Sequence, residues 1–208
     1  MSDHNATRAR VVAAFDFDGT LSSADSFLPF LRQVAGRAGY WRRMALLLPL
    51  LLAFRAGLIG STRAKTAVLR QFVRGMSRAQ MESHARRFAA GHLPAMIRPE
   101  ALARLRWHQA QGHRCVIVSA SLEMYLLPWA RSMGVDDVLA TRLEVTDGRC
   151  SGRLAGANCR GAEKVRRLEA WLGTRSDWTV YAYGDSGGDR ELLAWADHSW
   201  YRTMPAEG

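Results

Sequence analysis

The sequence predicts an α/β fold in which a helical segment is inserted directly after the first strand of a parallel sheet. Three observations support this class. An apolar run, Val11–Phe15, leads into an acidic turn; helical periodicity without strand-like alternation extends from Phe27 to about Arg98; and from Pro99 onward strands alternate with helices. We expect a Rossmann-like core over residues 1–26 and 100–208, with a helical cap over residues 27–99.

The first element, Val11–Thr20, has the pattern of a buried strand that runs into a turn, where Gly19 allows a tight bend. Beyond the cap we expect helices over residues 100–111, 122–133, 160–172 and 189–196, and strands over residues 114–119, 178–185 and 199–201. Between them, residues 137–145 are extended and Thr146–Arg149 form a hairpin-like turn. Such alternation indicates right-handed crossovers between parallel strands.

The cap divides into four periodic pieces, each of which ends at or near a glycine: residues 27–36, 41–57, 62–75 and 77–91. Ser77 is the expected N-cap of the fourth piece. Pro49 is unfavourable in the middle of a helix, so we expect it at a kink or a helix start.

Composition excludes several classes of protein. With 48% apolar and 23% charged residues, the chain is neither disordered nor a small disulfide scaffold. Its three cysteines cannot all pair and lie in no metal-binding spacing, which indicates reduced thiols and a cytoplasmic protein. Residues 1–10 have no apolar stretch typical of a secretory signal, and the 11-residue run Met44–Phe54 is too short to span a bilayer.

The charge of +10 is unevenly distributed. Between Phe27 and Ala110 there are 15 basic and two acidic residues, whereas the rest of the chain has 14 basic and 17 acidic ones. A basic nucleic-acid-binding module is the non-enzyme alternative, but the segment has no recognisable binding motif, so we expect no nucleic-acid partner. The run Met44–Phe54 is either the core of the cap or a peripheral contact with an anionic membrane, at the inner face of the cell membrane.

Polar side chains gather where the predicted strands end. Ligands of open α/β sheets bind beyond the carboxyl ends of the strands, so these side chains are expected to converge. They are Asp16, Asp18, Ser119, Lys164, Asp185 and Asp189.

This set of residue types can hold a divalent cation together with a phosphate group. Carboxylate oxygens bind Mg²⁺. The carboxylate of Asp16 can attack phosphorus, and Asp18 could protonate the leaving oxygen and then activate water. Ser119 and Lys164 would stabilise the phosphoryl oxygens.

Four features of the chain resemble, in the same order, the four motifs of the haloacid-dehalogenase-like phosphohydrolases. They are DFDGT at Asp16–Thr20, the strand that ends at Ser119, Lys164, and GDSGGD at Gly184–Asp189. A helical insert after the first motif is similar to the phosphoserine-phosphatase-like branch. The runs NCRGAEKVRRL and YGDSGGDRELLAWADHSWYR are most similar to the bacterial group that contains phosphatidylglycerophosphatase C.

The resemblance implies a Mg²⁺-dependent phosphomonoesterase. It makes Asp16 the nucleophile, Asp18 the acid and base, and Asp16, the Asp18 carbonyl and Asp185 the metal ligands, with Asp189 in support. Residues implied to bind the substrate or its phosphate are Gly19, Thr20, Asp25, Ser119, Ala120 and Lys164.

The substrate stays open at this point. A phospholipid headgroup such as phosphatidylglycerophosphate is one possibility, and the alternatives are a small metabolite, such as phosphoserine or a sugar phosphate, or transfer to an acceptor other than water. Asp25 stands where phosphoserine phosphatases have a longer glutamate, which argues against recognition of a serine amino group. Arg63 is a cap residue that could meet the leaving group. Ser121 is expected to cap the following helix, and His84, His92, His108 and His113 are expected on the surface or in the cap.

Overall fold

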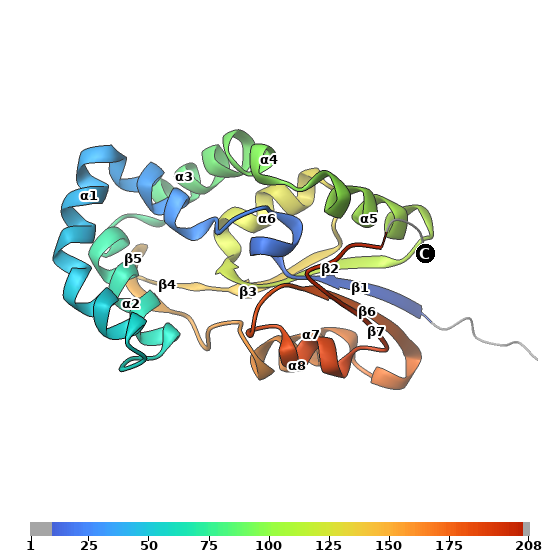
Figure 1. Ribbon diagram of the computed structural model, residues 1–208. Helices are drawn as coiled ribbons and strands as arrows, with labels where there is room; N and C mark the ends of the chain where they lie inside the picture. The colour runs from blue at the N-terminus through green and yellow to red at the C-terminus, as the bar shows by residue number, and fades with distance from the viewer. Residues whose placement is uncertain (1–9, 206–208) are drawn as a thin grey trace, which may run out of the picture.

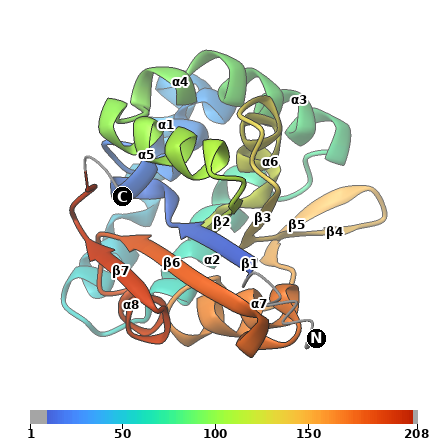
Figure 2. The same ribbon diagram turned by 90° about the vertical axis from the view of Figure 1, so that its right-hand side faces the viewer.

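The computed structural model describes residues 10–205 and has a five-stranded, all-parallel sheet at its centre (Figures 1 and 2). The strand order is β3-β2-β1-β6-β7, which confirms the predicted α/β class. The strands are β1 (Arg10–Phe15), β2 (Arg114–Leu122), β3 (Asp137–Thr141), β6 (Trp178–Gly184) and β7 (His198–Tyr201). The prediction about a secretory signal concerns residues that lie mostly outside the described range.

Helices cover both faces of the sheet, because its central strand is apolar on both sides. In β1, Ala13 and Phe15 pack toward one face, and Val12 and Ala14 pack toward the other. The first face is covered by α5 (Pro99–Ala110) and α6 (Glu123–Ser132), and the second by α7 (Ala162–Leu172) and α8 (Arg190–Trp195). All four helices lie within two residues of their predicted bounds.

The segment after β1 is helical, as expected. It contains α1 (Phe27–Arg55), α2 (Ser61–Val73), α3 (Arg78–Gly91) and α4 (Leu93–Met96). The backbone of α1 breaks at Gly36 (φ 68°, ψ 167°), a conformation open to glycine, and Pro49 lies inside the second part of the helix rather than at a kink or a start. Ser77 caps α3 as predicted, since its hydroxyl accepts from Gln80 N at 3.2 Å.

A β-hairpin leaves the main sheet and packs against the inserted helices. It consists of β4 (Leu143–Thr146) and β5 (Arg149–Leu154), joined by the predicted turn, in which Asp147 and Gly148 have φ values of 51° and 72°. Gly75 N donates to Cys150 O, and Cys150 N donates to Met76 O, each at 2.8 Å. The hairpin therefore anchors the end of α2, a packing that sequence analysis did not predict.

His108 and the three cysteines are buried in the core of the protein. The expectation for His108 was wrong: this side chain is fully buried behind the sheet, where Nε2 contacts the Tyr183 hydroxyl at 2.9 Å and Nδ1 contacts His113 Nδ1 at 2.8 Å. All three cysteines are buried and free. Over residues 10–205, none of the helices combines the length and apolar character needed to cross a bilayer.

Candidate active site

The site lies at the carboxyl edge of the three central strands. Phe15 of β1 pairs with Ile117 of β2 and with Tyr183 of β6, so the residues that follow these positions emerge at the same edge. The chain then makes a single wide turn over Phe17–Leu21, closed by a hydrogen bond from Ser22 N to Phe17 O at 2.8 Å. This edge collects the acidic, hydroxyl and amino groups that the sequence predicts.

Gly19 brings this turn against the end of β6. Its φ is 78°, and a Cβ atom built there would lie 2.3 Å from Asp185 Oδ2. Both the backbone conformation and the close approach require a residue without a side chain. Thr20 is buried beside it, and its hydroxyl lies 3.4 Å from Asp185 Oδ1.

A buried ion pair lies at the centre of the site. Lys164 of α7 places its Nζ 2.8 Å from Asp16 Oδ1 and 2.5 Å from Asp189 Oδ1. Burial raises the pKa of Asp16, and the Lys164 ammonium opposes that shift. Burial alone would lower the pKa of Lys164, but the two carboxylates raise it above its usual value. The lysine therefore stays charged and holds Asp16 in place.

Three carboxylates are close enough to share a cation. Asp16, Asp185 and Asp189 each have an oxygen, and these oxygens lie within 4.8 Å of one another. Asp189 is already engaged by Lys164 and by the Ser186 amide and hydroxyl, at 2.9 and 2.7 Å. Burial raises the pKa of Asp185. Hard oxygen donors at this spacing fit Mg²⁺, and Asp16 and Asp185 are the donors that are least engaged by the protein.

The carboxylate of Asp18 belongs to a separate hydrogen-bonded group. It accepts from Ser26 N at 2.9 Å and from the Ser121 hydroxyl, and the Ser26 hydroxyl lies 2.9 Å from the hydroxyl of Tyr125. Burial and the nearby charge of Asp25 raise the pKa of Asp18 to about 6, against these hydrogen bonds. A carboxyl with such a pKa can give and take a proton near neutral pH.

Ser121 is a site residue that sequence analysis misplaced. We expected it to cap the next helix, but β2 continues through it to Leu122, which precedes α6. Ser119 is buried at the same strand end, and its hydroxyl accepts from Ser121 N at 3.1 Å. The two-residue spacing of Ser119 and Ser121 could have indicated this placement, because residues two apart lie on the same face of a strand.

A cavity of about 420 Å³ opens over these groups. Its core side is lined by Asp16, Asp18, Ser119, Ala120 and Asp185, and its cap side by Phe27, Leu28, Leu51, Phe54 and Lys65. Asp25 lies at the same opening, where its Oδ1 accepts from Leu28 N at 3.1 Å. The predicted residues are thus brought together with a set of apolar side chains that had not been assigned to the site.

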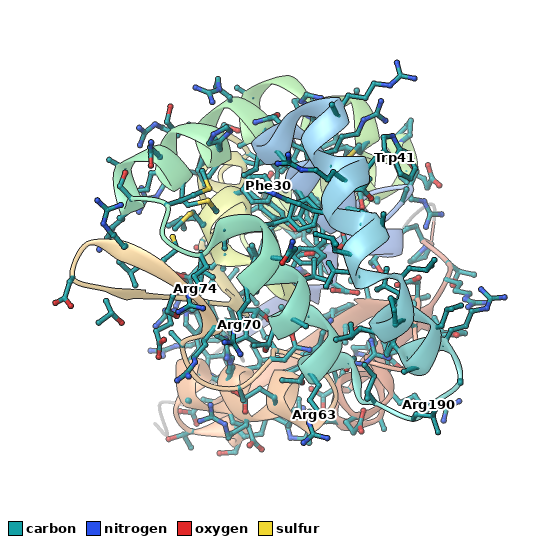
Figure 3. The ribbon with its side chains drawn as sticks, turned by 90° about the vertical axis from the view of Figure 1, so that its left-hand side faces the viewer. Phe30, Trp41, Arg63, Arg70, Arg74 and Arg190 are labelled. Atoms are coloured by element: carbon teal, nitrogen blue, oxygen red, sulfur yellow. The ribbon has the colours of Figure 1, made fainter. Side chains whose placement is uncertain are left out.

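Lys65, rather than Arg63, is the cap cation that reaches the cavity. Its Nζ donates to Ala120 O at 2.6 Å and lies 3.4 Å from Asn158 Oδ1 and 5.2 Å from the centre of the Phe27 ring. Burial lowers its pKa. Arg63, two residues earlier on α2, is exposed at the rim of the molecule and does not line the cavity (Figure 3).

Two curated proteins and one solved structure are similar to this chain in sequence. Protein CicA of Caulobacter vibrioides is 43% identical over 194 residues, which cover 92% of this chain and 86% of that protein. A probable phosphatase of Mycobacterium tuberculosis is 30% identical over 201 residues, covering 93% of this chain and 69% of that one. A Bordetella pertussis Tohama I structure described as a protein with unknown function is 28% identical with a TM-score of 0.80, covering 92% of this chain and 89% of that one.

A more distant structure supports the fold alone. It is a phospho-aspartyl intermediate analogue of phosphoserine phosphatase, 18% identical with a TM-score of 0.62, and it covers 92% of this chain and 86% of that one. Residues 13–194 match the family described as haloacid dehalogenase-like hydrolases. That range contains every residue assigned to the site above. The chain therefore belongs to the haloacid dehalogenase-like hydrolase family.

Proposed function

We propose that the protein is a phosphatase that hydrolyses phosphate monoesters through a phosphorylated Asp16. The observation that carries the proposal is the arrangement of two carboxyl groups, buried Asp16 and half-buried Asp18, with opposite tasks. Asp16 is oriented by Lys164 at 2.8 Å, and Asp18 is held apart from it by Ser26 and Ser121, with its pKa raised to about 6. One group is thus suited to nucleophilic attack and the other to proton transfer.

The reaction proceeds in two displacements. A carboxylate oxygen of Asp16 attacks phosphorus, the bond from phosphorus to the ester oxygen breaks, and Asp18 gives its proton to the leaving oxygen. Asp18 then takes a proton from water, whose oxygen attacks phosphorus and releases Asp16 and inorganic phosphate. Ser119 and Lys164 stabilise the negative charge on the phosphoryl oxygens during both displacements.

Asp16 and Asp185, together with the main-chain carbonyl of Asp18, are the groups that would hold Mg²⁺ in this proposal. When bound, the cation supplies positive charge that offsets the repulsion between carboxylates and phosphate. The three-carboxylate cluster of Asp16, Asp185 and Asp189 supports this assignment.

For the substrate class, we propose an ester whose leaving group has an apolar part. The cap side of the cavity supports this proposal, because Phe27, Leu28, Leu51 and Phe54 line it beside the single ammonium of Lys65. A small polar metabolite would leave this apolar wall in contact with water, whereas a lipid phosphate such as phosphatidylglycerophosphate would cover it.

The test is turnover of p-nitrophenyl phosphate by the purified protein with Mg²⁺ and with EDTA. We expect hydrolysis only with Mg²⁺ and its loss in Asp16→Asn, by at least about 1,000-fold because the nucleophile is removed. Asp147→Asn, in the exposed hairpin turn, is the matched control and should keep full activity. Turnover that survives Asp16→Asn, or that ignores EDTA, would refute the mechanism. Relative rates on lipid phosphates, sugar phosphates and phosphoserine then test the substrate class.

A further inference from the structure

The second part of α1 carries one line of apolar side chains that is covered and a second, adjacent line that is exposed. Tyr40 and Leu47 are buried against the neighbouring helices. On the second line lie Trp41, Leu48 and Leu52, which are 61%, 55% and 57% exposed. Their spacings of seven and four residues place these three side chains along one line of the helix. We call Trp41, Leu48 and Leu52 the α1 stripe.

The exposed apolar surface extends beyond the stripe. Leu46 and Pro49 are exposed on the same helix, and Leu58, in the turn that follows it, is 76% exposed. The run Met44–Phe54 is therefore neither wholly cap core nor wholly surface, since Leu47 packs inward while its neighbours face solvent. Several large apolar side chains exposed on one helix and its following turn are a feature of interaction surfaces.

The segment that carries the stripe is rich in basic residues. From Phe27 to Met81 the chain has ten basic residues and no Asp or Glu. Arg42 and Arg55 are exposed on α1 itself, and Arg63 is exposed at the start of α2, on the face that carries Trp41 (Figure 3). In a symmetric dimer formed through this surface, arginines would face arginines, so the charge distribution disfavours a second copy as the partner.

We propose that the α1 stripe, with its flanking arginines, docks on the surface of a bilayer that contains anionic phospholipid. Leucine side chains that enter the boundary between headgroups and acyl chains lose contact with water, and tryptophan is favoured at that depth. Arg42 and Arg55 lie at the height of the lipid phosphates, where they meet opposite charge. A neutral partner would use the leucines but leave the flanking arginines without complementary charge.

The docked orientation would bring the catalytic cavity to the lipid surface. Leu51 and Phe54, on the same helix as the stripe, line the cavity that contains Asp16. A helix lying on the bilayer would thus hold the cavity close to the lipid headgroups. Docking itself does not depend on the proposed function, and it can be measured in the Asp16→Asn variant.

The test is flotation of the full-length protein with vesicles of phosphatidylcholine alone or mixed with phosphatidylglycerol. We expect binding only to the anionic vesicles, and at least a tenfold loss of binding at high salt. Leu48→Asp and Arg42→Glu should each weaken binding at least tenfold. Tyr201→Asp is the matched control, because Tyr201 is also exposed (49%) but lies on β7, away from α1. Circular dichroism checks that each variant is folded.

A second measurement tests which residues enter the bilayer. Brominated lipids should quench tryptophan fluorescence of the bound protein, and Trp41→Phe should remove most of that quenching. The proposal is overturned by absence of vesicle binding at low salt, by equal binding to both vesicle types, or by equal losses in Tyr201→Asp and Leu48→Asp. It is also overturned if sedimentation shows a dimer that Leu48→Asp dissociates while vesicles bind nothing.

Discussion

Replacing Gly19 by alanine should reduce catalytic activity much more than it reduces the stability of the fold. At a φ of 78°, an alanine costs about 1–2 kcal/mol relative to an ordinary backbone conformation. In addition, its Cβ would lie 2.3 Å from Asp185 Oδ2, whereas ordinary contact begins at 3.4 Å. The carboxylate, or the turn that carries Asp18, must therefore shift by about 1 Å, a misplacement that can reduce a reaction rate about 100-fold.

The matched control for this variant is Gly148→Ala in the hairpin turn. Its φ is 72°, but nothing lies within 4 Å of the added Cβ. Both variants should lose about 2–8 °C in melting temperature from the backbone cost, and Gly19→Ala alone should lose turnover of p-nitrophenyl phosphate. Thermal unfolding by circular dichroism and steady-state kinetics measure the two effects. Equal activity of the two variants would refute the argument that the approach of Gly19 to Asp185 positions the site.

Two further predictions concern stability. Burial lowers the pKa of His108 to about 3, beside Arg104 and His113, so between that value and pH 6.5 the unfolded chain binds a proton that the folded chain does not. This group should thus lower the free energy of unfolding by about 1.4 kcal/mol for each pH unit below 6.5. Urea titrations at several pH values should show a flatter pH dependence of the unfolding free energy for His108→Gln than for the unaltered protein. Parallel pH dependences of the two proteins would contradict this prediction. Gly152→Ala should destabilise the protein more than Gly156→Ala. A Cβ at Gly152 would lie 2.6 Å from Arg70 Cα of α2, whereas one at Gly156 meets nothing within 4 Å. Equal melting temperatures of the two variants would exclude the close packing of Gly152 against Arg70.

The core of the fold could be predicted because its signals are local. Apolar runs such as Val11–Phe15 and the helices between strands follow from periodicity, and the parallel topology follows from their alternation. The same logic places Asp16, Ser119 and Asp185 at one edge, since parallel strands in register end together.

The features that could not be predicted depend on contacts between distant segments. The hairpin Leu143–Leu154 carries an ordinary turn signal, but its docking on α2 depends on Gly152 lying against Arg70. Lys65 resembles any other cap cation in the sequence, and only the packing of α2 brings it to Ala120, 55 positions along the chain. His108 follows a helical pattern that would suit an exposed face, yet Tyr183 provides a buried partner for it.

The cap segment is basic and the rest of the chain is slightly acidic, and this difference in charge affects the cavity between them. Its core side contributes the carboxylates of Asp16, Asp18 and Asp185 with the cations of Lys164 and Arg160, and its cap side contributes the ammonium of Lys65, on which the charges of Asp18 and Asp25 act. An anionic ester is repelled by uncompensated carboxylates, so a cation on the core side would be needed before the phosphoryl group could approach Asp16. The cap attracts the same ester without such help, because no acid occurs from Phe27 to Met81. In the proposed mechanism, attraction of the substrate and activation of Asp16 thus belong to different parts of the chain, and the cavity lies where these parts meet.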